Sequence, residues 1–126
     1  MRAFDSNVLV RVITRDDEEQ LAVAEAFVRN GAWVSQVVLA ETVWVLRSRY
    51  RLDRDAVATA IEMLLDHQQF TIQDADVAEA AVQQYRKTPA LRFTDCLILA
   101  SARRAGHLPL GTFDAGLSKL PGAERL

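Results

Sequence analysis

The sequence of 126 residues has only one cysteine, three prolines, five glycines and two histidines. A single cysteine excludes a disulfide within the chain, and it gives no indication of an oxidising compartment. No segment approaches the roughly 18 uninterrupted apolar residues that a membrane span needs. The start of the chain also lacks the long apolar run of a signal peptide, so we expect a cytoplasmic protein. His67, His107 and Cys96 do not stand at zinc-ligand spacing, and no activating motif predicts a Cys–His nucleophile.

An excess of basic charge is lacking too, because the formal net charge is −2. Nucleic-acid-binding proteins usually carry a basic surface. If four carboxylates were gathered around a metal ion, however, the rest of the chain would carry −2 + 4 = +2. Net charge therefore does not exclude an RNA substrate, although it predicts weak affinity unless a metal or a basic partner assists. Half of the residues are hydrophobic and a quarter are charged, which indicates one globular domain over residues 1–126.

Hydrophobic periodicity and turn signals predict strands that alternate with helices along the whole chain. This order, with connections long enough for right-handed crossovers, predicts an α/β domain of three layers. A mostly parallel sheet of four to five strands would be flanked by helices on both faces. The predicted elements are a buried strand ending at Asp5, a helix carrying 21–28, a strand at 32–35, helices at 37–50 and 53–66, a strand at 70–72, a helix from 74 to about 85, a helix capped by Thr94 and ending at Gly106, a strand at 108–111, a short helix at 115–119 and an edge strand at 124–126.

Asp5 has two interpretations when it is read alone. It follows an apolar strand and precedes Ser6 and Asn7. Aspartate at such a position commonly caps the next helix or turn, and this structural role is the more frequent one. The carboxyl edge of a parallel sheet is also where ligands bind in α/β folds. The other carboxylates of the chain decide between the two interpretations.

Three further carboxylates are poorly explained as surface residues. Glu41 lies within an apolar helix, Asp95 opens a helix of small and apolar residues, and Asp114 follows a strand. A buried carboxylate needs a partner charge or a metal. The ends of parallel strands and the starts of the following helices share one sheet edge, so we expect these three residues to join Asp5 there. Oxygen-only ligands favour Mg²⁺, with Mn²⁺ as a substitute.

Four segments together resemble the PIN-domain family and, within it, the VapC-type toxins of bacterial toxin–antitoxin pairs. They are Asp-Ser-Asn-Val-Leu at 5–9, Ala-Glu-Thr-Val-Trp-Val-Leu at 40–46, Phe-Thr-Asp-Cys-Leu-Ile-Leu-Ala at 93–100 and Thr-Phe-Asp at 112–114. Each segment alone is weak, but their order and spacing are specific. Two departures are visible: Ser6 stands where many relatives carry Thr, and 115–117 lack the polar or basic side chains often found after the last acid.

The resemblance implies an RNA endonuclease that is inhibited by a cognate antitoxin and is usually homodimeric. It implies that the acidic metal-binding residues are Asp5, Glu41, Asp95 and Asp114, and that Ser6, Asn7 and Thr112 orient carboxylates and water. A metal-activated water would attack the scissile phosphate, which would leave 5′-phosphate and 3′-hydroxyl products. The antitoxin could fill a groove lined by aromatic residues of the first helices, although core packing is the more common role for such residues.

Two alternative functions follow from the same residues. A phosphatase of the haloacid-dehalogenase type also begins with a strand ending in aspartate and uses Mg²⁺. It needs a second acid two residues after the first, where this chain has Asn7, and the chain lacks room for a cap domain. The other alternative is a catalytically inactive PIN-like interaction module. The four intact carboxylates argue against it.

Overall fold

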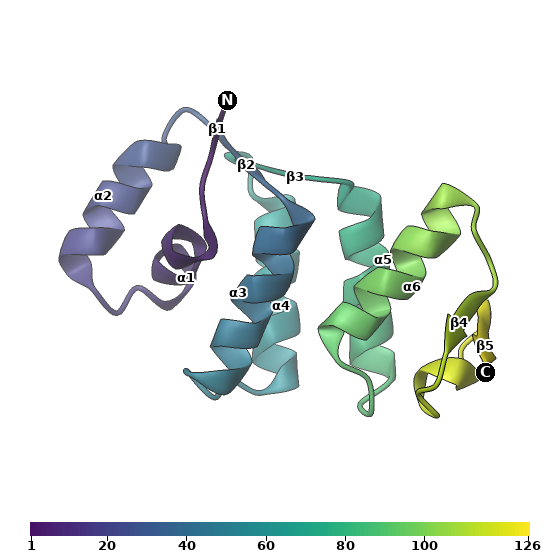
Figure 1. Ribbon diagram of the computed structural model, residues 1–126. Coiled ribbons are helices and arrows are strands. Elements are labelled where there is room, and N and C mark those ends of the chain that lie inside the picture. Colours follow the sequence, from purple (N-terminus) through teal and green to yellow (C-terminus); the bar gives the residue numbers. More distant parts are fainter. The chain divides into compact units, whose positions relative to one another are not determined.

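The computed structural model describes residues 1–126. The chain divides into two compact units, Met1–Ala75 and Asp76–Leu126, here called unit 1 and unit 2. Each has its own small parallel sheet and its own helices (Figure 1). We describe them one after the other.

Unit 1 holds a three-stranded parallel sheet in the order β1-β2-β3 and four helices. Helix α1 packs against α2 and α3, and α3 packs against α4, as the order of these helices in Figure 1 shows. The elements are β1 (Arg2–Ala3), α1 (Ser6–Thr14), α2 (Glu18–Val28), β2 (Ala32–Val34), α3 (Gln36–Ser48), α4 (Arg54–Asp66) and β3 (Phe70–Ile72).

The strands of unit 1 differ in burial. Strands β2 and β3 alternate buried, exposed and buried residues, as expected for strands with one face on a core. Strand β1 is exposed at both of its residues, so the prediction of a buried first strand is wrong. It lies at the edge of the sheet and pairs only with β2, Arg2 opposite Ala32 and Ala3 opposite Trp33. A two-residue edge strand covers little of the core.

The helix boundaries follow from caps that the sequence makes recognisable. The side chain of Ser35 accepts the N–H of Val38 at 3.1 Å, and that of Asp53 accepts the N–H of Ala56 at 2.8 Å, as predicted. Helix α1 was not predicted, because residues 8–13 are rich in β-branched side chains that favour strands. Burial of Leu9, which is fully inaccessible to solvent, and the cap at Asp5 outweigh that preference.

Unit 2 contains two helices, a 3₁₀ turn and a two-stranded parallel sheet. Its elements are α5 (Ala75–Lys87), whose first residue closes unit 1, α6 (Phe93–Ala105), β4 (Leu110–Thr112), η1 (Leu117–Lys119) and β5 (Ala123–Arg125). Tyr85 and Phe93 meet edge to face in its core, with ring centroids 5.7 Å apart. Gly106 ends α6 in the left-handed conformation, with φ +81°, as the sequence indicated.

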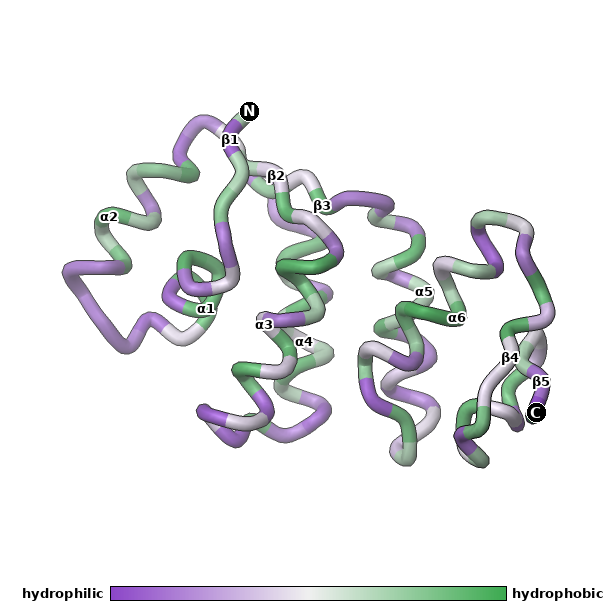
Figure 2. Tube along the Cα trace, in the orientation of Figure 1, coloured by the Kyte–Doolittle hydropathy of each residue, from purple (hydrophilic) through white to green (hydrophobic).

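The predicted α/β class with parallel strands is confirmed. The strand number agrees as well, although the five strands pair as a group of three and a group of two. Figure 2 shows hydrophobic and hydrophilic residues alternating along the helices, the pattern from which they were predicted. None of the helices is long and apolar enough to span a membrane.

Candidate metal centre

Asp5 lies between β1 and α1 and caps the helix. Its Oδ1 accepts the backbone N–H of Asn7 at 3.1 Å and that of Val8 at 3.4 Å. The structural role considered for Asp5 is therefore real. It engages only one carboxylate oxygen, because Oδ2 accepts no hydrogen bond within the chain. Asp5 can cap α1 and still offer an oxygen to a ligand.

Glu41 is joined to the start of α1 by a hydrogen bond between side chains. The hydroxyl of Ser6 donates to Oε1 of Glu41, and Ser6 is only 4% exposed. The sequence predicted a buried Glu41, but this residue is exposed. It is not among the buried residues of α3, which are Leu39, Thr42, Val43 and Leu46. The packing of α1 on α3 thus brings Ser6 and Glu41 together within unit 1.

Asp95 is the best buried of the four acids, with 9% of its surface exposed. Helix α6 begins at Phe93, two residues before the start predicted from a cap at Thr94, so Asp95 occupies its third position rather than its first. Its Oδ2 accepts the backbone N–H of Arg92 at 3.1 Å. This is one half of a capping box, because an arginine side chain has no acceptor for the other half. The prediction that Thr94 caps the helix is wrong; Arg92 holds that position.

Asp114 organises the turn after β4. Its backbone N–H donates to Oγ1 of Thr112 at 3.0 Å, and its Oδ2 accepts the N–H of Leu117 at 2.7 Å. The threonine predicted to orient an acid thus touches Asp114, through the backbone. The carboxylate is exposed, and its Oδ1 accepts no hydrogen bond.

Arg92 is the residue of this region that sequence reasoning missed. Its Nη2 lies 3.3 Å from Oδ1 of Asp95 and its Nε lies 3.4 Å from Oδ2. The hydrogen bonds to Asp95, then the charge of that carboxylate and, more weakly, the charge of Asp114 raise the pKa of Arg92. A cation three residues before an acid at a helix start is a recognisable signal, because residues at i and i+3 are neighbours there.

A comparison with protein families then bears on these residues. The profile of the PIN domain matches residues 3–123. The chain belongs to the PIN-domain family. It is also similar to a protein of Aquifex aeolicus named VapC ribonuclease, with 22% identity over 125 residues, 95% of this chain and 92% of the relative. The resemblance seen in the four sequence segments is thereby confirmed.

The donors that the chain offers at these positions suit a divalent cation of the Mg²⁺ class. They are carboxylate and hydroxyl oxygens, without sulfur or imidazole. Asp5 and Glu41 lie in unit 1, and Asp95 and Asp114 lie in unit 2. Neither unit by itself gathers three metal-ligating side chains. Of the residues with sulfur or imidazole donors, Cys96 is buried and His67 packs on the ring of Phe70, with 4.8 Å between the ring centroids.

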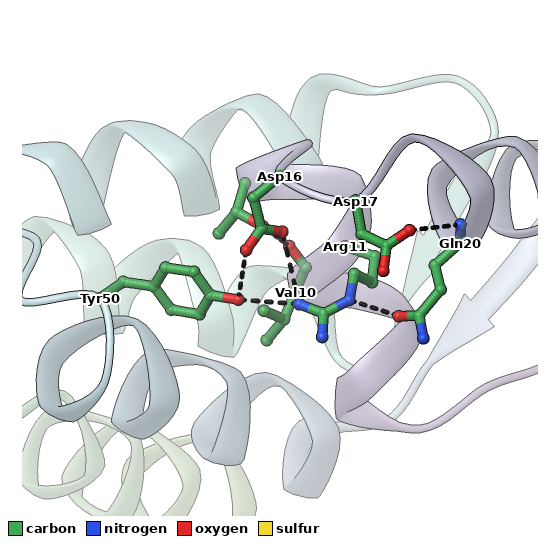
Figure 3. A network of polar contacts seen from close by, with 7 residues as sticks. Val10, Arg11, Asp16, Asp17, Gln20 and Tyr50 are labelled. Atoms are coloured by element: carbon green, nitrogen blue, oxygen red, sulfur yellow. Dashed lines mark hydrogen bonds and ion pairs between the residues drawn. The ribbon is translucent and has the colours of Figure 1, made fainter.

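A second polar network, in unit 1, was not predicted at all (Figure 3). The guanidinium of Arg11 donates to the hydroxyl of Tyr50 at 2.8 Å, to Gln20, and to Asp16 at 3.4 Å. The hydrogen bond that Arg11 donates to Tyr50 is the main reason that the pKa of Arg11 is raised. The hydroxyl of Thr14, and then that of Tyr50, lower the pKa of Asp16. Tyr50 lies 34 residues from Asp16, so only tertiary packing reveals this network.

Proposed function

We propose that this chain is a metal-dependent endoribonuclease of the VapC type, with Mg²⁺ bound by Asp5, Glu41, Asp95 and Asp114. The family match over residues 3–123 carries this proposal. The relative named VapC ribonuclease, which aligns over nearly the whole of both chains, supports RNA as the substrate. The four acids of the family-like segments are all present, and all offer oxygen.

The chain's own residues would each have a defined task. Bound Mg²⁺ supplies a water of lowered pKa and neutralises charge on the phosphate. Asp5, Glu41 and Asp114 each keep one carboxylate oxygen that accepts no hydrogen bond from the protein, so they can bind without losing their present contacts. Asp95 differs, because Arg92 contacts both of its oxygens.

The contacts of three further residues bear on the positioning roles proposed for them. Ser6 donates to Glu41 and fixes one of its oxygens, so that the other is presented in a defined direction. Thr112 holds the backbone of Asp114. The backbone of Asn7 holds Asp5, and we propose that its amide side chain orients water beside that carboxylate.

The domain organisation and the partners belong to the same proposal. Residues 1–126 act as one nuclease domain, since the PIN profile spans both units and each unit holds only two of the acids. The protein is a cytoplasmic toxin that a cognate antitoxin inhibits, and it forms a homodimer. Co-purification with the product of a neighbouring reading frame, with light scattering for the mass, tests the last two points.

The decisive experiment is RNA cleavage with and without metal. The wild type is expected to cleave RNA in Mg²⁺ or Mn²⁺ and to stop when EDTA is added. Asp5→Asn should lower the rate at least about a hundredfold while the far-UV circular dichroism is unchanged. The control is Asp66→Asn, an exposed acid at the end of α4, which should cleave like the wild type.

Two results would count against the proposal. One is a folded Asp5→Asn variant that cleaves at the wild-type rate. The other is a wild type that neither cleaves RNA nor melts at a higher temperature with millimolar Mn²⁺, since a ligand that binds only the folded state raises the melting temperature. That second result would favour the inactive interaction module.

A further inference from the structure

Asp95 is the one proposed metal ligand whose two carboxylate oxygens both accept hydrogen bonds. Its Oδ2 accepts the backbone N–H of Arg92 at 3.1 Å and the Nε–H of the same residue at 3.4 Å, and its Oδ1 accepts Nη2–H at 3.3 Å. Each of the other three acids has one oxygen that accepts no hydrogen bond from the protein. Asp95 would match them if the guanidinium moved away, because Oδ1 has no other donor.

The guanidinium of Arg92 is loosely held. Its side chain is 81% exposed, and its contacts with Asp95 are longer than the roughly 2.7–2.9 Å of a close charge-assisted hydrogen bond. An ion pair this exposed contributes little to stability, since water solvates a guanidinium that swings outward. The backbone N–H of Arg92, at the N-cap of α6, keeps its own bond to Oδ2 wherever the side chain lies. Asp95 therefore stays oriented when the guanidinium leaves.

The turn that carries Asp114 lies against the same stretch of chain. A Cβ placed on Gly116 would be 3.3 Å from Oδ2 of Asp114 and 3.5 Å from Cδ2 of Leu91, the residue before Arg92. The negative charge of Asp114 accordingly acts on Arg92, although more weakly than that of Asp95. Arg92 and the two acids together carry one net negative charge. A bound divalent cation would make this sum positive, and the group would then attract an anion.

We propose that Arg92 is an exchangeable counter-ion: it neutralises Asp95 in the metal-free chain, leaves Oδ1 when a divalent cation binds there, and then binds the phosphate of the RNA. The metal and the substrate in this inference rest on the proposed function. The parallel N–H donors of a guanidinium fit two phosphate oxygens, and arginine side chains commonly stabilise the charge of a reacting phosphate. The same side chain would thus compensate a carboxylate before metal binding and a phosphate after it.

The first test measures metal binding without RNA. Arg92→Gln removes the cation that competes for Asp95, so we expect it to bind Mn²⁺ about tenfold more tightly than the wild type, the effect of losing one charge-assisted contact. Titration with Mn²⁺, followed by the melting temperature, measures the affinity. The matched control is Arg104→Gln, which should bind Mn²⁺ like the wild type. Arg104 lies at the other end of α6, and its Nη1 pairs with the carboxylate of Asp76 at 2.6 Å.

The second test measures RNA cleavage at saturating Mg²⁺. Arg92→Gln should cleave about a hundredfold more slowly although it binds metal more tightly, because the phosphate loses its guanidinium. Arg92→Lys should recover part of the rate, since lysine keeps the charge but not the parallel donors. A residue that only shaped the start of α6 would not change metal affinity and cleavage in opposite directions. Melting temperatures in EDTA show that the variants are folded.

Two results would overturn the inference. One is unchanged or weaker Mn²⁺ binding by folded Arg92→Gln, since Arg92 would then not compete with the metal. The other is tighter Mn²⁺ binding with cleavage at the wild-type rate, since Arg92 would then not serve the phosphate. In both cases a wild type that cleaves RNA leaves the proposed function standing. If Arg92→Gln binds Mn²⁺ more tightly than the wild type but neither protein cleaves RNA, the exchange at Asp95 stands and the nuclease proposal fails.

Discussion

Asp95 of unit 2 is held differently from the two acids of unit 1. In unit 1, Asp5 and Glu41 accept hydrogen bonds from neutral donors, two backbone amides and the hydroxyl of Ser6. In unit 2, Asp95 is paired with a guanidinium from its own helix start. A neutral donor orients a carboxylate but leaves its charge uncompensated, whereas a guanidinium also compensates the charge. Acids of one family pattern thus have different partners, neutral donors in one case and a cation in the other.

Substituting one acid from each unit is expected to have its largest effect on catalysis. Glu41→Gln and Asp95→Asn each remove a metal-binding charge, one from each unit, while nearly keeping side-chain shape. Both should lower the rate of RNA cleavage at least about a hundredfold, because ligands of one ion act together. Initial rates at saturating Mg²⁺ measure this. Loss of cleavage in only one of the two variants would mean that the acids of the two units do not serve one site.

A smaller effect is expected at the hydroxyl that orients Glu41. Ser6→Ala removes the donor to Oε1 and should lower metal affinity and cleavage about ten- to a hundredfold, as losses of orienting contacts do. Ser6→Thr keeps the hydroxyl, and many relatives are expected to carry it, so it should remain close to the wild type. Titration with Mn²⁺, followed by the melting temperature, separates binding from catalysis. Equal behaviour of the two variants would argue against an orienting role.

The same comparison predicts different stabilities without metal. Asp95→Asn removes a negative charge from the first turn of α6, where the helix dipole favours it, and should cost about 0.5 to 1 kcal/mol. Glu41→Gln keeps an acceptor for Ser6 at an exposed position and should change stability by less than about 0.5 kcal/mol. Urea unfolding in EDTA measures both. A larger cost for Glu41→Gln would reverse the distinction drawn between the units.

The smallest effect concerns pH and the network of Figure 3. The hydroxyl of Thr14, and then that of Tyr50, lower the pKa of Asp16 below its ordinary value of 3.8. Because the pKa of Asp16 is lower in the folded state, its ionised form stabilises the fold above pH 3.8. This stabilisation is lost as the pH falls through the pKa of the folded state. Asp16→Asn should therefore be less stable than the wild type at pH 6, and the gap should shrink as the pH falls below about 3.8. Urea midpoints between pH 3 and 6 measure the gap. A constant gap would contradict this account.

Much of the fold could be predicted because the signals are local. The caps at Ser35 and Asp53, the strand at 70–72 and the glycine that ends α6 are properties of short segments, and the structure confirms them. The first strand and first helix were predicted less well. There the β-branched residues favour a strand locally, and burial against α2 and α3 favours a helix.

Some features of the candidate site could likewise be predicted from short segments, and others could not. The four acids could be picked out because each stands in a family-like segment: Asp5 and Asp114 follow strands, Asp95 opens a helix and Glu41 lies within an apolar helix. The exposure of Glu41 was not readable, because helical spacing alone did not show which face of α3 is covered. Arg92 could have been found from its spacing to Asp95. The contacts of Arg11 with Tyr50 and Asp16 could not, since no local pattern links residues that distant in sequence.

By itself, the sequence determined the α/β class, most of the elements and the four segments that resemble the PIN family. These depend on side-chain chemistry and on periodicity over a few residues, which the chain carries wherever it is folded. Only the tertiary structure decided that Ser6 holds Glu41, that Arg92 compensates Asp95, and that a cavity lies next to Asp5. The contact between Ser6 and Glu41 and the cavity both depend on how helices pack, and packing is set by burial summed over many residues.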